Sequence, residues 1–472
     1  MRQHQLGNMP LLWCSSVHHS GFSSRRPGFK SRQEHQEQFH HGFRNSTHEF
    51  KTHDLLGQSV DDMPLDVESI REDFPILDRK LPNGKQLVYF DNAATSQKPQ
   101  CVIDAMSEFY SEYNSNAHRA NHTLADEATT ALEGARMSIS SYFGTSPEQM
   151  VYTSGATEAI NLVSYAWARE NLSSDDVIVL TEMEHHADIV PWQQLSKEKG
   201  VEVRYVPIDT HSFTLDMEAF EVAVNGASLV CVVHTSNVLG IRNPIERIVE
   251  LSHSQGARVL LDCAQGAPHE RIRFDDSGVD FVAISAHKMG GPTGIGCLLV
   301  KKDAMSQMAP FMTGGSMIKT VSVEGSTFQE GHAMLETGTP RIAEAIGWGA
   351  AVEWLGGYDM KEVHSHINRI ASWTAGQISE IEGITVYGDP SREDSSGAVS
   401  FLHESIQSQD LALLLDEGGF AVRTGHHCAQ PLMDALGVPS TNRASFWLYN
   451  TMEEAEAFVE HLRYVVDRFS DK

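Results

Sequence analysis

The stretch Phe281-Val-Ala-Ile-Ser-Ala-His-Lys288, followed by Met289-Gly-Gly-Pro-Thr-Gly-Ile-Gly296, is the most informative part of the sequence. Its apolar run predicts a buried strand that ends in a serine, a histidine and a lysine. The four glycines and the proline that follow predict a loop. Lys288 is therefore expected at the end of a strand. A lysine in such a place is ordinarily a solvated surface charge, so other segments must decide its role.

Most of the chain around Lys288 repeats one pattern, in which short apolar runs are separated mostly by segments with helical periodicity. This alternation is typical of βα units in a parallel sheet that is covered by helices on both faces. The strands predicted in this part are 149–153, 177–181, 201–207, 229–235, 258–262, 281–285 and 296–301. We therefore predict a large α/β domain over residues 66–340, with a mainly parallel seven-stranded sheet.

The pattern differs at the two ends of the folded region. Before the sheet, a short strand at 87–90 is followed by helices at 99–113 and 123–143. After Pro340 the sequence predicts helices at 341–357 and 360–382, strands at 397–403 and 443–448, and a closing helix at 452–469. We interpret residues 341–472 as a smaller α+β domain against which the N-terminal segment packs.

The composition narrows the class of protein. The formal charge is −27 over 472 residues, which argues against nucleic acid or an anionic membrane surface as a partner. Six cysteines without a CxxC pair indicate free thiols in a reducing compartment. No apolar run approaches the roughly 18 residues of a membrane span, so we expect a soluble protein.

Residues 1–60 have a different character. They hold seven Lys or Arg and four Asp or Glu, a net charge of +3, which leaves −30 on the rest of the chain. They are rich in Ser, His, Gln and Arg and lack a sustained period, so we predict disorder. Such an extension resembles an organelle transit peptide. We expect the plastid stroma, with the mitochondrion or the cytoplasm as alternatives. A dispensable tail or a wrongly assigned start codon is equally compatible with the composition.

Polar residues follow several of the predicted strands, where an open parallel sheet gathers ligand-binding loops. Ser154 to Thr157 form a small-residue turn that opens a helix and suits a phosphate. His185 offers a flat ring, Asp262 a buried carboxylate for a pyridinium nitrogen, and Lys288 an amine for an aldehyde. Each group alone has an ordinary structural explanation, but together they describe a site for pyridoxal 5'-phosphate.

The sequence also resembles a known family, the group II or SUF-type cysteine desulfurases, which are pyridoxal-phosphate enzymes of fold type I. It looks closest to plant and algal plastid forms. The resemblance extends from about Asp66 to Phe469. The segments that carry it are Tyr89-Phe-Asp-Asn-Ala-Ala-Thr95, His118-Arg-Ala-Asn-His-Thr123, Gly155-Ala-Thr-Glu158, Met183-Glu-His-His-Ala187, Asp262-Cys-Ala-Gln265, Ser285-Ala-His-Lys288, Glu336-Thr-Gly-Thr-Pro340 and Arg423-Thr-Gly-His-His-Cys-Ala-Gln-Pro431.

The resemblance implies a role for each matching residue. Lys288 would form the Schiff base, His185 would stack on the ring, and Asp262 would pair with the ring nitrogen. The ring oxygen would bind Gln265 and Asn237. The remaining cofactor-binding residues would hold the phosphate, and they are Ala156, Thr157, Ser285, His287 and, from the partner of a homodimer, Thr339.

The substrate side is assigned in the same way. Arg443 would clamp the carboxylate of L-cysteine, with Asn237 and His118 nearby, and Cys428 would be the nucleophile that takes up sulfur as a persulfide. The product would be L-alanine. The resemblance further implies a SufE-like sulfur acceptor, SUF scaffold proteins and a role in iron-sulfur cluster assembly.

Alternatives remain at this stage. Cys428 alone could be an inert buried thiol, although two histidines and an arginine lie within five residues of it and can favour the thiolate. A zinc or iron site built from His426, Cys428 and the 185–186 histidine pair lacks metal-ligand spacing, so we expect no metal. Selenocysteine lyase on the same scaffold, or a catalytically silent sulfur-relay protein, would also be compatible with the fold.

Overall fold

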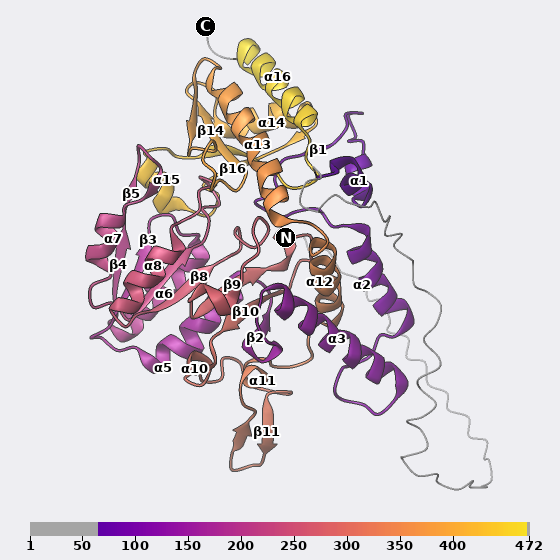
Figure 1. The fold of residues 1–472 in the computed structure, drawn as a ribbon, viewed down its shortest axis with the longest axis vertical. Coiled ribbons are helices and arrows are strands. Elements are labelled where there is room, and N and C mark those ends of the chain that lie inside the picture. The colour runs from indigo at the N-terminus through magenta and orange to yellow at the C-terminus, as the bar shows by residue number, and fades with distance from the viewer. Residues whose placement is uncertain (1–64, 470–472) are drawn as a thin grey trace, which may run out of the picture. The chain divides into compact units, whose positions relative to one another are not determined.

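A computed structural model of the chain describes residues 65–469. The predictions for residues 1–60 lie outside the described residues. The described residues form one compact unit that contains two main sheets. Figure 1 shows these sheets and the helices around them.

The larger sheet has seven strands in the order β2-β10-β9-β8-β7-β3-β4. Their bounds are β2 Met150–Thr153, β10 Gly296–Val300, β9 Phe281–Ser285, β8 Arg258–Asp262, β7 Leu229–Val233, β3 Val177–Thr181 and β4 Glu202–Val206. All residues of β2, β3, β7, β9 and β10 are buried, which explains their near-continuous apolar sequences. The mainly parallel seven-stranded sheet is confirmed.

One strand departs from the parallel arrangement. β10 runs antiparallel to both of its neighbours, β2 and β9. The ten residues between β9 and β10 are too few for a helical crossover, so the chain turns back beside β9. Gly296 allows this return, because a Cβ there would lie 2.2 Å from the Ile284 carbonyl oxygen and 2.6 Å from Gly155 Cα. The strand predicted at 296–301 is thus an antiparallel member of the mainly parallel sheet.

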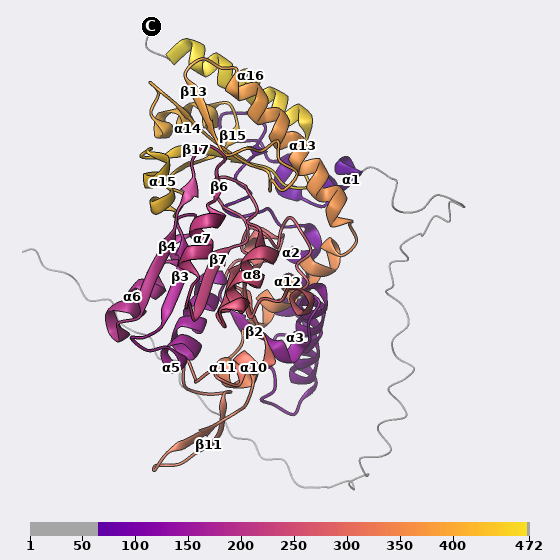
Figure 2. The ribbon, with the colours of Figure 1, turned by 60° about the vertical axis from the view of Figure 1, so that its left-hand side comes forward.

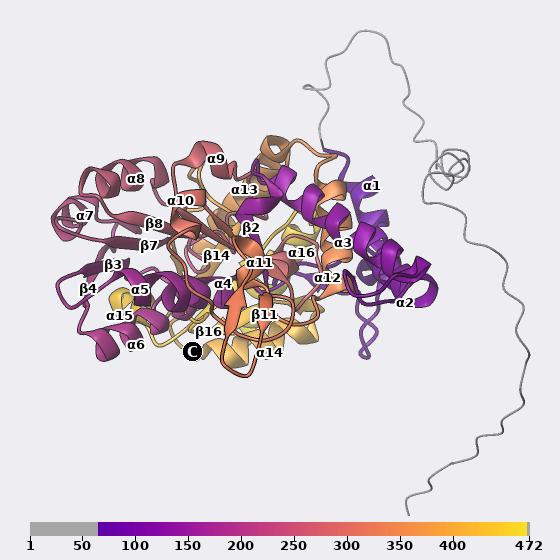
Figure 3. The same ribbon diagram turned by 90° about the horizontal axis from the view of Figure 1, so that it is seen from below.

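Helices cover both faces of the large sheet (Figures 1 and 3). One group contains α4 Ala156–Leu162, which continues through a π-helical turn to α5 Arg169–Asn171, and α6 Val190–Lys199. Other helices include α7 Met217–Ala223 and α8 Ile245–Ser254. A third set, α2 Gln100–Glu112, α3 Thr123–Tyr142 and α12 Ile342–Leu355, packs together. The helix predicted at 341–357 thus packs against the two helices predicted before the sheet.

The smaller sheet is antiparallel, in the order β13-β14-β17-β16. Its strands are β13 Ile384–Tyr387, β14 Ala398–His403, β17 Thr441–Ser445 and β16 Arg423–Gly425, and α13 Met360–Ser379, α14 Ser408–Glu417 and α16 Met452–Phe469 accompany it (Figure 2). β17 begins two residues before the strand predicted at 443–448. The early strand β1 Val88–Tyr89 pairs with β15 Phe420–Ala421, which ties the N-terminal segment to this part of the chain.

Two further structural facts bear on function. Within residues 65–469 no helix combines the length and apolar character needed to cross a membrane. In the same residues no group of three or more His, Cys, Asp or Glu side chains is placed to hold a metal ion.

Candidate active site

A cavity of about 180 Å³ lies where β2, β3, β7, β8 and β9 end. These strands are parallel to one another, so their carboxyl ends meet at one edge of the sheet. Ten of the predicted site residues line the cavity: Ala156, Thr157, His185, Asn237, Asp262, Gln265, Ser285, His287, Lys288 and Arg443.

Lys288 projects into the cavity from a 3-10 turn, Ala286–Lys288, directly after β9. Burial lowers the pKa of its amine to about 8, although the Asp262 carboxylate opposes this shift. An amine with this pKa is partly neutral near pH 7.5, and a neutral amine is the form that attacks a carbonyl carbon. The structure thus rejects the reading of Lys288 as a solvated surface charge.

Asp262 ends β8 and is almost fully buried. Its Oδ1 accepts a hydrogen bond of 2.8 Å from the Ala264 N–H, which leaves Oδ2 available to a ligand. Burial raises its pKa, while the Ala264 N–H and the Lys288 charge oppose the rise. A cationic N–H in the cavity would add the partner that a buried carboxylate needs.

The turn after β2 approaches the turn after β9. The Ala156 N–H donates to Ser285 Oγ at 2.8 Å. The sequence suggested that this amide would be free to bind a phosphate, and it is not. The Ser285 hydroxyl hydrogen remains available, and Thr157 is exposed in the first turn of α4. Burial, followed by the Lys288 charge, lowers the pKa of His287 to about 4, so this ring is neutral at pH 7.

His185 follows β3 and faces the same cavity. Its Nδ1 accepts the Ala187 N–H at 3.1 Å, which fixes the plane of the ring. Burial, followed by the Lys288 charge, lowers its pKa to about 4. A neutral, oriented imidazole is suited to stacking on a flat ligand.

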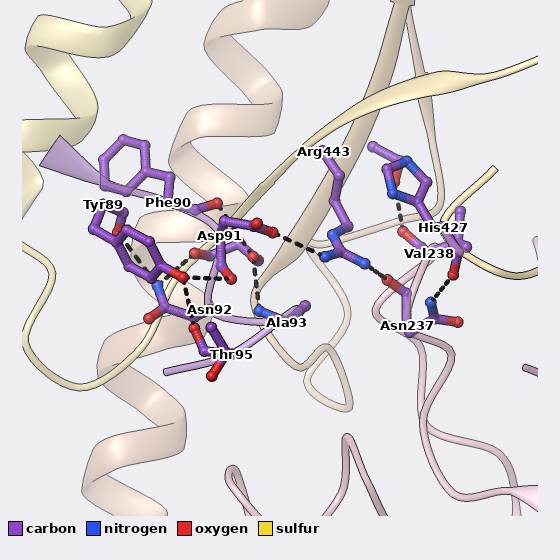
Figure 4. A network of polar contacts seen from close by, with 12 residues as sticks. Tyr89, Phe90, Asp91, Asn92, Ala93, Thr95, Asn237, Val238, His427 and Arg443 are labelled. Atoms are coloured by element: carbon purple, nitrogen blue, oxygen red, sulfur yellow. Dashed lines mark hydrogen bonds and ion pairs between the residues drawn. The ribbon is translucent and has the colours of Figure 1, made fainter. Parts of the chain in front are cut away.

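Arg443 reaches the cavity from β17 of the smaller sheet and is only 1% exposed. Figure 4 shows its two contacts: Nη2 donates to Asp91 Oδ1 at 3.2 Å, and Nη1 donates to the Asn237 carbonyl at 2.6 Å. Its Nε is buried without a partner. Burial lowers its pKa to about 10, so the guanidinium stays charged at pH 7, and its Nε–H is available to an anion.

Cys428 lies beside the cavity, and its neighbour His427 is the residue that lines it. The thiol is partly exposed, in contrast to the buried thiols of Cys231, Cys263 and Cys297. It belongs to a loop of four residues, 426–429, between β16 and α15 Gln430–Leu436. The sequence-based alternative of an inert buried thiol therefore does not fit.

Two predicted residues lie elsewhere in this chain. Thr339 and His118 line a second cavity of about 720 Å³. There His118 Nε2 lies 3.1 Å from Glu133 Oε1. A single chain therefore does not bring either residue to the first cavity, and the prediction of His118 as a residue beside the substrate is not met within one subunit.

Sequence reasoning missed several residues of the site. Arg423 and His427 line the cavity, and Arg423 lies opposite Arg443 in the register of β16 and β17. The pairing of these two arginines across a sheet was not visible in the sequence. Arg423 was quoted only as the start of the segment that contains Cys428, and Arg443 only as the residue for the substrate carboxylate. Asp91 was quoted only as part of a turn, and its contact with Arg443 spans 352 positions.

A buried acid pair, Glu184 and Asp188, was also missed. Both side chains are fully buried. Glu184 Oε1 accepts from Thr181 Oγ1 at 2.6 Å, and Asp188 Oδ1 accepts from Trp192 Nε1 at 3.1 Å. The other carboxyl oxygen of each has no partner. Burial and their mutual repulsion raise the pKa of Glu184, and burial and the Asp262 charge raise that of Asp188, so these carboxyls keep their protons to higher pH than they would in water.

This pair predicts a pH-dependent effect of Glu184→Gln. The folded protein binds these protons more tightly than the unfolded chain, so its free energy of unfolding falls as pH rises above the unfolded carboxyl pKa of about 4. The glutamine amide cannot ionise, so the substitution removes part of this loss of stability. In urea unfolding, we expect the stability of the variant relative to the parent to be greater at pH 8 than at pH 5. Glu456→Gln, an exposed change on α16, is the control. Equal differences at both pH values would contradict a raised pKa of Glu184 in the folded protein.

The lining residues fit the predicted pyridoxal 5'-phosphate. The cavity offers a buried carboxylate, a neutral imidazole, an amine of lowered pKa and a serine hydroxyl at a helix start. Asn237 supplies a further indication, since its Oδ1 is buried without a partner while its Nδ2 donates to the His427 carbonyl at 2.7 Å. Gln265 is fixed beside them, because its Nε2 donates to the Ala93 carbonyl at 2.6 Å.

Comparisons with known proteins agree with this geometry. The model of the aminotransferase class-V family matches residues 88–458. A probable cysteine desulfurase of Halalkalibacterium halodurans is 44% identical over 407 residues, which cover 86% of this chain and 99% of that protein. The cysteine desulfurase of Haloferax volcanii is 42% identical over 411 residues, which cover 84% of this chain and 96% of that protein.

Two solved structures have the same fold. The apo cysteine desulfurase of Thermococcus onnurineus NA1 aligns with a TM-score of 0.81 and 33% identity, covering 86% of this chain and 99% of that one. The cysteine desulfurase CsdA of Escherichia coli aligns with a TM-score of 0.78 and 34% identity, covering 85% of this chain and 99% of that one.

Proposed function

The chain belongs to the aminotransferase class-V family and is a pyridoxal-phosphate-dependent cysteine desulfurase, and from this premise we propose that Lys288, Arg443 and Cys428 convert L-cysteine to L-alanine. One observation carries the assignment of residues. A lysine of lowered pKa, a buried carboxylate and a buried arginine line one cavity, with a partly exposed thiol in the adjoining loop.

The cofactor supplies an electron sink that makes the Cα proton of an attached amino acid acidic. Asp262 would keep the ring nitrogen protonated, and His185 would stack on the ring. Ser285 and the start of α4 would hold the phosphate. Lys288, with a pKa of about 8, is suited both to anchor the cofactor and to move a proton at the substrate carbon.

Arg443 would bind the substrate carboxylate through its free Nε–H and the edge of its planar fork. The Asn237 carbonyl and Asp91 hold the guanidinium from the other side. The substrate would then lie with its sulfur toward Cys428. The thiolate of this residue forms the new S–S bond, the C–S bond breaks, and the three-carbon fragment takes up protons to leave as L-alanine.

The activity is tested by measuring alanine and persulfide formed from L-cysteine by the purified protein. In Arg443→Lys we expect KM for L-cysteine to rise about 10- to 100-fold, because the ammonium replaces a planar fork in a buried site. The visible absorption of the bound cofactor should stay within the parent's range. An unchanged KM would show that another group binds the carboxylate, and absence of alanine from the parent would refute the activity.

A homodimer is the assembly that we propose. The second cavity contains Thr339 and His118, and in a dimer these residues would complete the partner's site. The nearby hairpin of β11 Ile318–Val321 and β12 Ser326–Phe328 supports this proposal, since it leaves Val321 61% and Val323 99% exposed. Apolar side chains on a projecting hairpin are typical of a surface that another chain covers.

We also propose the finer class and the sulfur acceptor. The motifs and the short, anchored loop around Cys428 favour a group II, SUF-type enzyme that passes persulfide sulfur to a SufE-like acceptor and then to SUF scaffold proteins for iron-sulfur cluster assembly. The basic, Arg- and Ser-rich segment 1–60 favours a plastid address. A fluorescent protein fused to residues 1–65 should enter plastids, and its exclusion from them would refute this address.

A further inference from the structure

The backbone at the thiol is held in an uncommon conformation. His427 has φ of 52° and Cys428 has φ of 60°, although neither is a glycine. The left-handed region costs a non-glycine residue about 1 to 2 kcal/mol, so two in succession persist only where the surroundings hold them.

Three hydrogen bonds from the loops of the large sheet hold the loop that carries Cys428. Asn237 Nδ2 donates to the His427 carbonyl at 2.7 Å. The His186 N–H donates to the Cys428 carbonyl at 2.8 Å. The Gln430 N–H donates to His186 Nε2 at 3.0 Å. His186 thus contacts the segment from Cys428 to Gln430 twice, once through its backbone and once through its ring.

The ring contact has a clear physical basis. Gln430 is the first residue of α15, so its N–H has no acceptor within the helix. The ring of His186 supplies that acceptor from a segment 244 positions away. Accepting requires an unprotonated Nε2, and burial, followed by the His426 charge, lowers the pKa of His186 and favours the neutral ring.

We propose that His186 is a positioning residue for the nucleophile, which fixes loop 426–429 at its junction with α15 so that the Cys428 sulfur keeps its place beside the cavity. The two adjacent histidines then have separate tasks. His185 lines the cavity, whereas His186 holds the cysteine loop. This inference rests on the proposed role of Cys428 as the nucleophile.

The test uses the holoenzyme of His186→Leu, which fills similar space but accepts no hydrogen bond. Alkylation of Cys428 by iodoacetamide, followed on its peptide by mass spectrometry, should become about fivefold faster, as expected for one lost hydrogen bond. The kcat for L-cysteine should fall by at least about the same factor. KM and the cofactor absorption should stay within about twofold. His186→Gln, whose amide oxygen can accept the Gln430 N–H, should restore much of the parent behaviour.

His211→Leu is the matched control, because the side chain of this histidine is 97% exposed, and it should change none of these quantities. Parent-like alkylation and kcat in His186→Leu would overturn the proposal. So would a joint loss of thermal stability, cofactor absorption and kcat that His186→Gln does not rescue, since that pattern indicates general misfolding. Alkylation does not depend on turnover, so its result stands even if a Cys428→Ser variant shows that the thiol is not the nucleophile.

Discussion

Lys288→Ala is expected to abolish the visible absorption of the lysine-bound cofactor and to lower kcat for L-cysteine at least about 10⁴-fold. The amine has two tasks in one cavity, covalent anchoring and proton transfer at the substrate carbon. General acid–base catalysis alone contributes about 10²- to 10⁴-fold, and loss of the anchor adds to it. The charge of the Asp262 carboxylate acts on Lys288, whose pKa of about 8 suits the amine to both tasks.

The measurement is an absorption spectrum of the purified protein before and after L-cysteine, together with alanine formation. Lys361→Ala, an exposed substitution in the first turn of α13, is the matched control and should retain the parent spectrum and rate. A Lys288→Ala protein that still shows the absorption of a lysine-bound cofactor would refute the assignment of Lys288 as the anchor.

Cys428→Ser is expected to separate cofactor binding from sulfur transfer. The spectrum of the bound cofactor should be that of the parent, because Cys428 lies beside the cavity and does not line it. Sulfur release from L-cysteine should fall at least about 100-fold, since a serine hydroxyl is a far weaker nucleophile toward sulfur than a thiolate. The persulfide should be absent from the peptide that contains residue 428.

Cys101→Ser provides the matched control, because Cys101 is an exposed thiol on α2 outside the site. It should leave the rate and the persulfide unchanged. A parent rate of sulfur release in Cys428→Ser would show that another group takes up the sulfur. Turnover of selenocysteine distinguishes the related lyase activity, which would survive in Cys428→Ser if the selenium leaves without attack by a thiol.

The comparison of sequence and structure is most instructive at the cofactor side. Asp262, His185 and Lys288 were predicted because each follows an apolar strand, and parallel strands bring their carboxyl ends to one edge. A local pattern was therefore enough to place them. The partner of the Ala156 N–H could not be placed by a local pattern, because it is a serine 129 positions later.

Contacts between the two sheets were beyond local patterns. The ion pair of Arg443 with Asp91 and the bond from Asn237 to the His427 carbonyl join segments that are 352 and 190 positions apart. The acid pair of Glu184 and Asp188 was missed for another reason. Charged residues are usually exposed to solvent, so two carboxylates near a histidine pair gave no sign of burial. Only the surrounding strands and helices show that both side chains are buried.

The sequence by itself determined the alternation of strands and helices, the edge at which the site lies and the residue types that suit its chemistry. It did so because strand and helix periods, turns and strand-end polar residues are local properties of the chain. The tertiary structure alone decided the antiparallel return of β10, the pKa of Lys288 and the left-handed loop at Cys428. These depend on burial and on contacts between distant segments, in which the neighbours rather than the residue itself set the energy.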